Sequence, residues 1–197
     1  MTNSKVFGIG LSRTGTKSLA AALNMLGIRT KWYPQDYQTY CELLMANYRL
    51  SILEKYDGLT DTPVVPYYAQ FDSLYPGSRF VLTVRNKQLW LASCAKHWAN
   101  SGIKGPESIN APFWRHFAQW IDSVVYGSYQ FNADRWSYVY DTHIRNVAWY
   151  FSNRPNDLLV LDVSDKDAFH RLSTFLGCDA LPGPFPTVND FQSPLLG

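Results

Sequence analysis

The segment Lys5–Ser18 reads KVFGIGLSRTGTKS and joins a short apolar run to a loop rich in glycine and hydroxyl side chains. The apolar run Lys5–Gly10 is typical of a buried strand. Apolar side chains at three- and four-residue spacing predict a helix over Thr16–Leu26. A loop between such a strand and helix points backbone N–H groups and the positive helix end at one place. We therefore predict a phosphate or similar oxyanion site in this loop.

The side chains of the loop strengthen this prediction. Arg13 and Lys17 supply two cations, and Thr14, Thr16 and Ser18 supply hydroxyl donors. The alternative is a plain strand-to-helix turn that carries two surface cations. That alternative does not explain why glycines, hydroxyls and cations coincide directly after a strand.

The loop differs from that of a magnesium-dependent phosphotransferase. A Walker A loop reads GxxxxGK[ST]. Here Gly10 to Gly15 fits the first half, but Thr16 separates the second glycine from Lys17. Such enzymes also hold Mg²⁺ with an acidic residue at the end of a strand. The clearest later strand is followed instead by Arg85.

The remaining pattern alternates between strands and helices. Arg79–Val84 (RFVLTV) predicts a strand, Ile28–Trp32 is a candidate strand, and the continuous apolar run Leu158–Val163 (LLVLDV) predicts one covered on both faces. This alternation predicts a P-loop-type α/β fold of three layers, α/β/α, around a mostly parallel sheet of four to five strands. The other helices are expected at Gln38–Glu54, Val64–Tyr75, Gln88–Trp98, Phe113–Tyr126, Asp134–Asn153 and Asp167–Leu176, with a loop at Ser101–Pro112.

The chain has 197 residues, which predicts a single domain over 1–197. An aromatic-rich helical insertion is expected at about 101–153, on the substrate side. Aromatic residues make up 16% of the chain, which favours a ring-rich core, an aromatic-lined substrate pocket, or both. The aromatic side chains that gather in the insertion are Trp114, Trp120, Trp136, Tyr138, Tyr140 and Trp149.

Composition excludes several classes of protein. The net charge of +2 gives no electrostatic case for a nucleic-acid or anionic-membrane partner. No apolar run reaches 18 residues, and the start of the chain lacks the pattern of a signal peptide. Three cysteines without zinc spacing favour a reducing compartment. We expect a cytoplasmic protein without a membrane span; the sequence does not specify its oligomeric state.

The loop resembles that of sulfotransferases, which use 3′-phosphoadenosine 5′-phosphosulfate (PAPS). Their 5′-phosphosulfate loop has a cation, a small residue and Gly-Thr, as in Arg13-Thr14-Gly15-Thr16, followed here by Lys17. The resemblance implies that residues 12–18 bind the phosphosulfate. It also implies that the cation at position 13, usually lysine in the family, stabilises the leaving phosphate.

A second family element follows the strand at 79–84. The sulfotransferase 3′-phosphate site is an arginine at a strand end and a serine eight residues later, which Arg85 and Ser93 match. The resemblance covers most of the chain and is closest to compact members with a GxSRTGTKSL loop. The sequence departs from cytosolic members at Ser18, where they place a tryptophan that stacks on adenine. It also lacks their C-terminal Arg-Lys-Gly element.

The resemblance implies metal-free, in-line transfer of a sulfuryl group to a hydroxyl or amine of a small-molecule or carbohydrate acceptor. Arg13 and Lys17 would stabilise the developing charge. Two residues are candidates for the general base. Asp61 follows a predicted strand, and His97 lies one helical turn after Ser93. Two other functions stay open: a P-loop nucleotide kinase or hydrolase, and a non-catalytic nucleotide-binding module.

Overall fold

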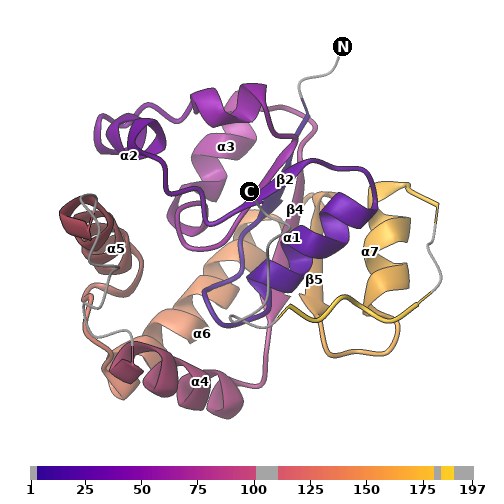
Figure 1. The fold of residues 1–197 in the computed structure, drawn as a ribbon. Coiled ribbons are helices and arrows are strands. Elements are labelled where there is room, and N and C mark those ends of the chain that lie inside the picture. Colours follow the sequence, from indigo (N-terminus) through magenta and orange to yellow (C-terminus); the bar gives the residue numbers. More distant parts are fainter. Residues whose placement is uncertain (1–3, 101–110, 180–182, 189–197) are drawn as a thin grey trace.

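The computed structural model describes residues 4–100, 111–179 and 183–188. Its five strands form one sheet in the order β2-β3-β1-β4-β5, and each neighbouring pair is parallel (Figure 1). The strands are β1 (Val6–Gly8), β2 (Thr30–Trp32), β3 (Gly58–Thr60), β4 (Arg79–Val84) and β5 (Leu158–Asp162). The predicted fold class is confirmed, and the described sheet is parallel throughout.

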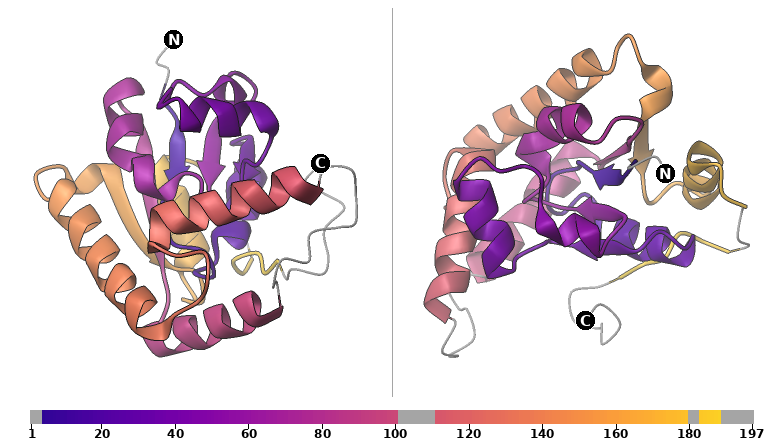
Figure 2. Two further views of the ribbon diagram at one scale, coloured as in Figure 1. Left: turned by 90° about the vertical axis from the view of Figure 1, so that its left-hand side faces the viewer. Right: turned by 90° about the horizontal axis from the view of Figure 1, so that it is seen from above.

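Helices cover both faces of the sheet and complete the three layers. In Figure 1, α1 and α7 lie on one side of the strands, and α3 and α6 lie on the other, with α2 and α5 further out. The two views in Figure 2 show the same layers from the side and from above. The described helices are α1 (Thr16–Met25), α2 (Tyr37–Leu44), α3 (Tyr68–Leu74), α4 (Lys87–Asn100), α5 (Ala111–Tyr126), α6 (Ala133–Tyr150) and α7 (Ala168–Leu176), with 3₁₀ turns at Ser51–Glu54, Val65–Tyr67 and Pro155–Asp157.

Alternation along the strands divides the core between the two faces, because successive strand residues point in opposite directions. On one face Phe7 stacks on Phe71 of α3 with ring centroids 4.8 Å apart. On the same face Phe80 lies 4.9 Å from Phe151, the residue after α6. The other face packs against α1 and α7 through a separate apolar cluster that includes Val6, Leu19, Leu23, Val81, Leu161, Ala168 and Leu172.

A third cluster joins α4, α5 and α6 beyond the carboxyl end of β4. Trp90, Tyr126 and Trp136 are fully buried there. The rings of Tyr126 and Trp136 stack 3.8 Å apart, and Trp98 packs edge-on against Trp136 at 4.4 Å. This helical group is held together by large rings, so part of the aromatic content belongs to the core.

Two expectations about single elements are wrong. The helix expected over Gln38–Glu54 ends at Leu44, because the chain turns at Ala46, whose φ of 55° is left-handed, before a 3₁₀ turn at 51–54. The run at 158–163 is not fully covered on both faces, because Leu161 is the one buried residue of β5, which is the edge strand of the sheet. Its central residue Val160 is 43% exposed.

The insertion expected at about 101–153 is represented in the described chain by α5 and α6. The loop expected at 101–112 lies mostly outside the described residues. Among the described helices, none combines the length and the apolar character needed to cross a membrane. All three cysteines are free thiols.

Candidate active site

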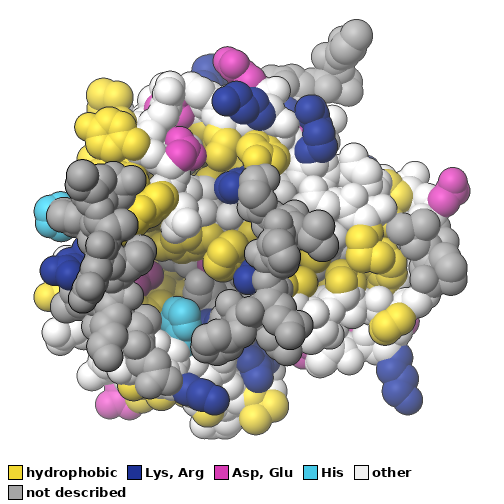
Figure 3. Space-filling model, viewed as in Figure 1, with side chains coloured by type: hydrophobic (Ala, Val, Ile, Leu, Met, Phe, Trp, Pro, Cys, Tyr) yellow, Lys and Arg dark blue, Asp and Glu magenta, His cyan; other side chains and the backbone are white. Residues whose placement is uncertain are grey.

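A cavity of about 1020 Å³ lies at the carboxyl ends of the central strands. Ligands of open α/β sheets bind at this edge. Its walls come from the loop after β1, the residues that follow β2, β3 and β4, the helices α4 and α5, and the segment 183–188. The space-filling view shows hydrophobic side chains and a histidine in the hollow between α5 and α1, with Lys and Arg side chains at its margin (Figure 3).

The loop after β1 is locked by its own hydrogen bonds. The Thr14 hydroxyl donates to the Leu11 carbonyl at 2.7 Å and shares a 2.6 Å hydrogen bond with the hydroxyl of Thr83 in β4. A Cβ on Gly10 would lie 1.9 Å from that Thr83 hydroxyl, so only glycine fits there. Gly15 has a φ of 100°, a left-handed conformation that glycine adopts without strain. The two glycines therefore set the path of the loop between β1 and α1.

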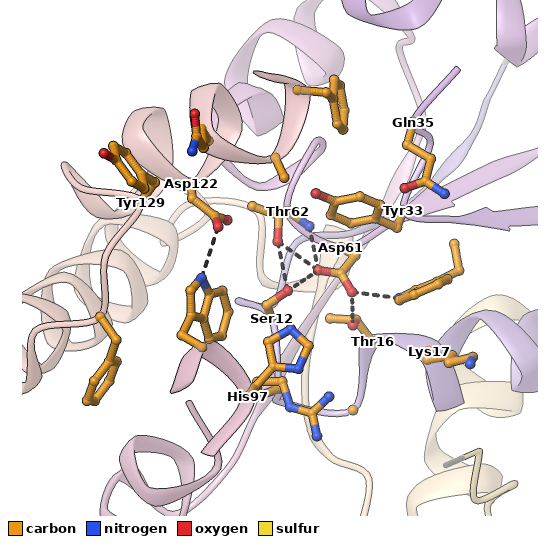
Figure 4. A pocket seen from close by; sticks show the side chains of 18 of the residues that line it. Ser12, Thr16, Lys17, Tyr33, Gln35, Asp61, Thr62, His97, Asp122 and Tyr129 are labelled. Carbon is orange, nitrogen blue, oxygen red and sulfur yellow. Dashed lines mark hydrogen bonds between the residues drawn. The ribbon is translucent and has the colours of Figure 1, made fainter. Parts of the chain in front are cut away.

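Asp61 connects the loop to the neighbouring strands. Its Oδ1 accepts from the Ser12 hydroxyl at 2.5 Å and from the backbone N–H and hydroxyl of Thr62. Its Oδ2 accepts from the Thr16 hydroxyl at 2.5 Å and from the Trp32 indole N–H at 2.6 Å. The carboxylate thus receives five hydrogen bonds, and it fixes two hydroxyls of the loop in place (Figure 4).

Backbone strain is concentrated around the cavity. Four described residues other than glycine have positive φ: Arg13 (71°), Tyr33 (45°), Ala46 (55°) and Asp61 (82°). Three of them line the cavity, with Ala46 as the exception. Non-glycine residues in this region each cost of order 1–3 kcal/mol and cluster at functional sites. The strain therefore supports this cavity as the functional site, independently of the sequence motifs.

The predicted 3′-phosphate residues come together with the loop cation. The Arg13 guanidinium donates from Nε to the Ser93 hydroxyl of α4 at 3.2 Å. Arg85 donates from Nη1 to the Arg13 carbonyl at 3.3 Å. The Tyr140 hydroxyl accepts from the backbone N–H of Arg85 and donates to its carbonyl, which anchors the position after β4. Lys17 lies with its amino group 5.0 Å from the centre of the Trp32 ring.

Most of the residues predicted from the sequence line this one cavity. Those that do so are Ser12, Arg13, Gly15, Thr16, Lys17, Ser18, Asp61, Arg85 and His97. Thr14 and Ser93 are not among the lining residues. Thr14 is buried within the loop, and Ser93 accepts a hydrogen bond from Arg13, which does line the cavity. The structure brings these positions together, and their individual roles stay predictions.

Sequence reasoning missed several contributors to the cavity, among them a carboxylate, a tyrosine and a C-terminal segment. Asp122 of α5 and Tyr33 after β2 both line it, as does the segment 183–188 through Val188. The backbone N–H of Val188 donates to the Ser18 hydroxyl at 3.2 Å. One signal for Asp122 was present, since it is a lone carboxylate in the apolar stretch WIDSVV. Of the six aromatic residues singled out in the insertion, only Trp114 lines the cavity.

Burial raises the pKa of Asp122 to about 7, and the nearby charge of Asp61 acts in the same direction. The Trp98 indole N–H, which donates to Oδ2 of Asp122 at 3.0 Å, acts in the opposite direction but does not outweigh burial. Burial also holds the pKa of Tyr33 well above its usual range, with help from both carboxylates. The cavity therefore contains a carboxyl group that changes its charge near neutral pH.

An acidic residue does follow a strand next to β1, although β4 is followed by Arg85. Asp61 follows β3 and bonds to Thr16 at the start of α1. In P-loop nucleotide hydrolases such a carboxylate helps to hold Mg²⁺. Here its five hydrogen bonds already occupy both oxygens. Among the described residues, no group of three or more His, Cys, Asp and Glu side chains is arranged to hold a metal ion.

The parallel sheet, the glycine-containing loop after β1 and the helix that follows define a P-loop-type α/β protein. A family model described as the sulfotransferase domain matches residues 5–193. The chain belongs to this sulfotransferase domain family, and its five-stranded parallel sheet is consistent with the family's P-loop fold. No curated protein matches the chain.

Proposed function

We propose that this protein transfers the sulfuryl group of PAPS to a hydroxyl or amine of a small-molecule or carbohydrate acceptor. The observation that carries the proposal is that Arg13, which lines the cavity, is hydrogen-bonded to both Ser93 and Arg85. One cation comes from the loop after β1, and the other two residues come from the β4–α4 unit. PAPS carries phosphate groups at both the 5′ and 3′ positions of its ribose. It therefore needs one anion site at the loop and a second at the β4–α4 unit. We further propose that the whole chain forms a single domain, with the helical stretch at about 101–153 on the acceptor side.

The chemistry of the lining residues fits such a donor. Loop amides, the hydroxyl of Ser18 and the cations Arg13 and Lys17 would hold the 5′-phosphosulfate. The Arg85 guanidinium and the Ser93 hydroxyl would hold the 3′-phosphate. PAPS, when bound, supplies an activated sulfuryl group that already has a phosphate leaving group.

Fixed cations suit this transfer. Charge grows on the oxygen between sulfur and phosphorus as that bond breaks. Preorganised positive groups stabilise such charge without reorganisation of solvent. Arg13 and Lys17 are the candidates, and we propose that they act without a metal ion. The general base is proposed among the carboxylates and His97 in the cavity.

One observation favours the kinase or hydrolase alternative, namely the hydrogen bond from Thr16 to Asp61 at the end of β3. Its phosphate donor would require Mg²⁺, whereas sulfuryl transfer as proposed would not. A non-catalytic nucleotide-binding protein would keep the anion site and show neither reaction.

Transfer of ³⁵S-labelled sulfate from PAPS separates these possibilities. With a panel of phenols, alcohols and sugars, we expect labelled product and equal rates in excess EDTA and in Mg²⁺. Hydrolysis of Mg-ATP without sulfate transfer would identify the alternative enzyme. Binding of the nucleotide without either reaction would identify a binding module.

A further inference from the structure

Asp122 reaches the cavity from α5, opposite the loop after β1. Its carboxylate points into the cavity, and the side chains of Thr62 and Ser12 lie beyond it (Figure 4). The Trp98 indole N–H provides its only hydrogen bond within the described part of the chain, and that bond occupies Oδ2. Oδ1 therefore keeps its capacity to accept a proton or hydrogen bond from a ligand in the cavity.

Asp61 and Asp122 differ in the number of hydrogen bonds that their carboxylates accept. Asp61 receives five hydrogen bonds, two of them from hydroxyls of the loop. A carboxylate used in this way cannot take up a proton without releasing the loop. Asp122 receives one hydrogen bond, and burial raises its pKa to about 7, where a general base works best at neutral pH.

Most of the aromatic side chains that line the cavity come from α4, α5 and the residues after α5, the side from which Asp122 reaches the cavity. We call this side of the cavity the aromatic chamber, and its rings are those of Tyr33, Trp98, Trp114, Phe117, Tyr129 and Phe131. Arg13, Lys17 and Arg85 lie at the loop end, and Arg115 on α5 also lines the cavity. Flat rings favour flat apolar ligands, and burying a charged ligand group among them would be costly.

We propose that Asp122 is the general base of this site and that the acceptor is an uncharged aromatic alcohol or phenol bound in the aromatic chamber. The proposal rests on the sulfotransferase function proposed above. Asp122 takes the proton of the acceptor hydroxyl while the acceptor oxygen forms a bond to sulfur. The bond between sulfur and the bridging oxygen breaks, and its electron pair leaves with the 5′-phosphate of adenosine 3′,5′-bisphosphate.

Other titratable and charged groups act on Asp122 or share its cavity. They are Cys94 and His97 of α4, Arg115 and Tyr126 of α5, Tyr129 after α5, Tyr33 after β2, Asp61 after β3, Arg13 and Lys17 of the loop and the start of α1, and Arg85 after β4. Burial raises the pKa of Cys94 to about 12 and holds those of Tyr33 and Tyr126 well above the usual tyrosine value. His97 is the remaining side chain of a type that titrates near neutrality, so it is the necessary control.

The test is the pH dependence of kcat/KM for Asp122→Asn, with 2-naphthol as acceptor and PAPS as donor. Asparagine keeps an oxygen for the Trp98 N–H but cannot take a proton. In the wild type, kcat/KM should rise as the pH passes about 7, where Asp122 becomes ionised. In Asp122→Asn we expect kcat to fall by about 10²–10⁴-fold and the rise near pH 7 to disappear. The KM for PAPS should stay the same, which also shows that the variant is folded.

His97→Gln should keep the rise near pH 7. If the rise is lost in His97→Gln and kept in Asp122→Asn, His97 is the base and the proposal is wrong. If Asp122→Asn keeps both kcat and the wild-type profile, the general-base assignment fails while the sulfotransferase function stands. If the wild type transfers sulfate to no acceptor, both proposals fail.

A matched pair of acceptors tests the substrate class. The wild type should sulfonate 2-naphthol with a kcat/KM at least tenfold above that of 6-hydroxy-2-naphthoate, because the carboxylate at the far end of the ring would be buried among apolar rings. Equal use of the two compounds, or transfer only to sugars, would overturn this part of the proposal.

Discussion

Arg13→Ala should lower kcat/KM for sulfate transfer by on the order of 10²–10³-fold, the effect of removing one electrostatic donor from a transition state. The loss has two physical sources. The guanidinium no longer faces the oxygen on which charge develops. The Ser93 hydroxyl also loses a hydrogen-bond donor that orders it, because the Arg13 guanidinium donates to it. Steady-state kinetics with PAPS, over a range that separates kcat from KM, measure the effect.

Two further variants make this result specific. Arg13→Lys keeps a positive charge at this position, unlike Arg13→Ala. It should therefore retain most of kcat. Arg29→Ala removes an exposed arginine that pairs with Asp57 at the opposite end of β3, and it should leave kcat/KM unchanged. If Arg13→Ala turned over like Arg29→Ala, the proposed role of the loop cation would be wrong.

Asp61→Ala should lower the free energy of unfolding by about 2–4 kcal/mol, since each buried polar group left without a partner costs about 1–3 kcal/mol. The substitution removes the common acceptor of Ser12, Thr16 and Trp32. Water can reach some of these donors through the cavity, so their costs do not add in full. Urea unfolding followed by circular dichroism measures the change.

Asp57→Ala is the matched control, because Asp57 and Asp61 lie on either side of the three-residue strand β3. Asp57 is half-exposed and pairs with Arg29 at 2.8 Å. Such a surface pair contributes about 0–1 kcal/mol. Equal losses in the two variants would show that Asp61 does not organise the loop as described.

The parts of the fold that follow from local sequence were predicted well. The strand at Arg79–Val84 was correct at both ends, because its apolar run is bounded by a Pro-Gly turn and by the polar residues 85–87. The strand–loop–helix unit at the start of the chain was also recognisable, because glycine and hydroxyl residues follow an apolar run. Arg85 and Ser93 belong to one strand–helix unit, so their spacing along the chain already places them near each other.

The parts that depend on distant contacts were not predictable. β5 looked like a central strand, because composition shows apolar character and does not show position within a sheet. Asp122 became a candidate only when α5 was seen to face the cavity. Val188 reaches Ser18 across 170 positions of sequence, a contact that no local pattern indicates.

The central claim is that the loop and the β4–α4 unit together bind a nucleotide with phosphates at both ends of its ribose. Isothermal titration of adenosine 3′,5′-bisphosphate in EDTA, compared with ADP in Mg²⁺, tests it most directly. We predict tighter binding of the 3′,5′-bisphosphate and loss of that preference in Arg85→Ala. Tighter binding of Mg-ADP, or an Arg85→Ala variant that keeps the preference, would contradict it.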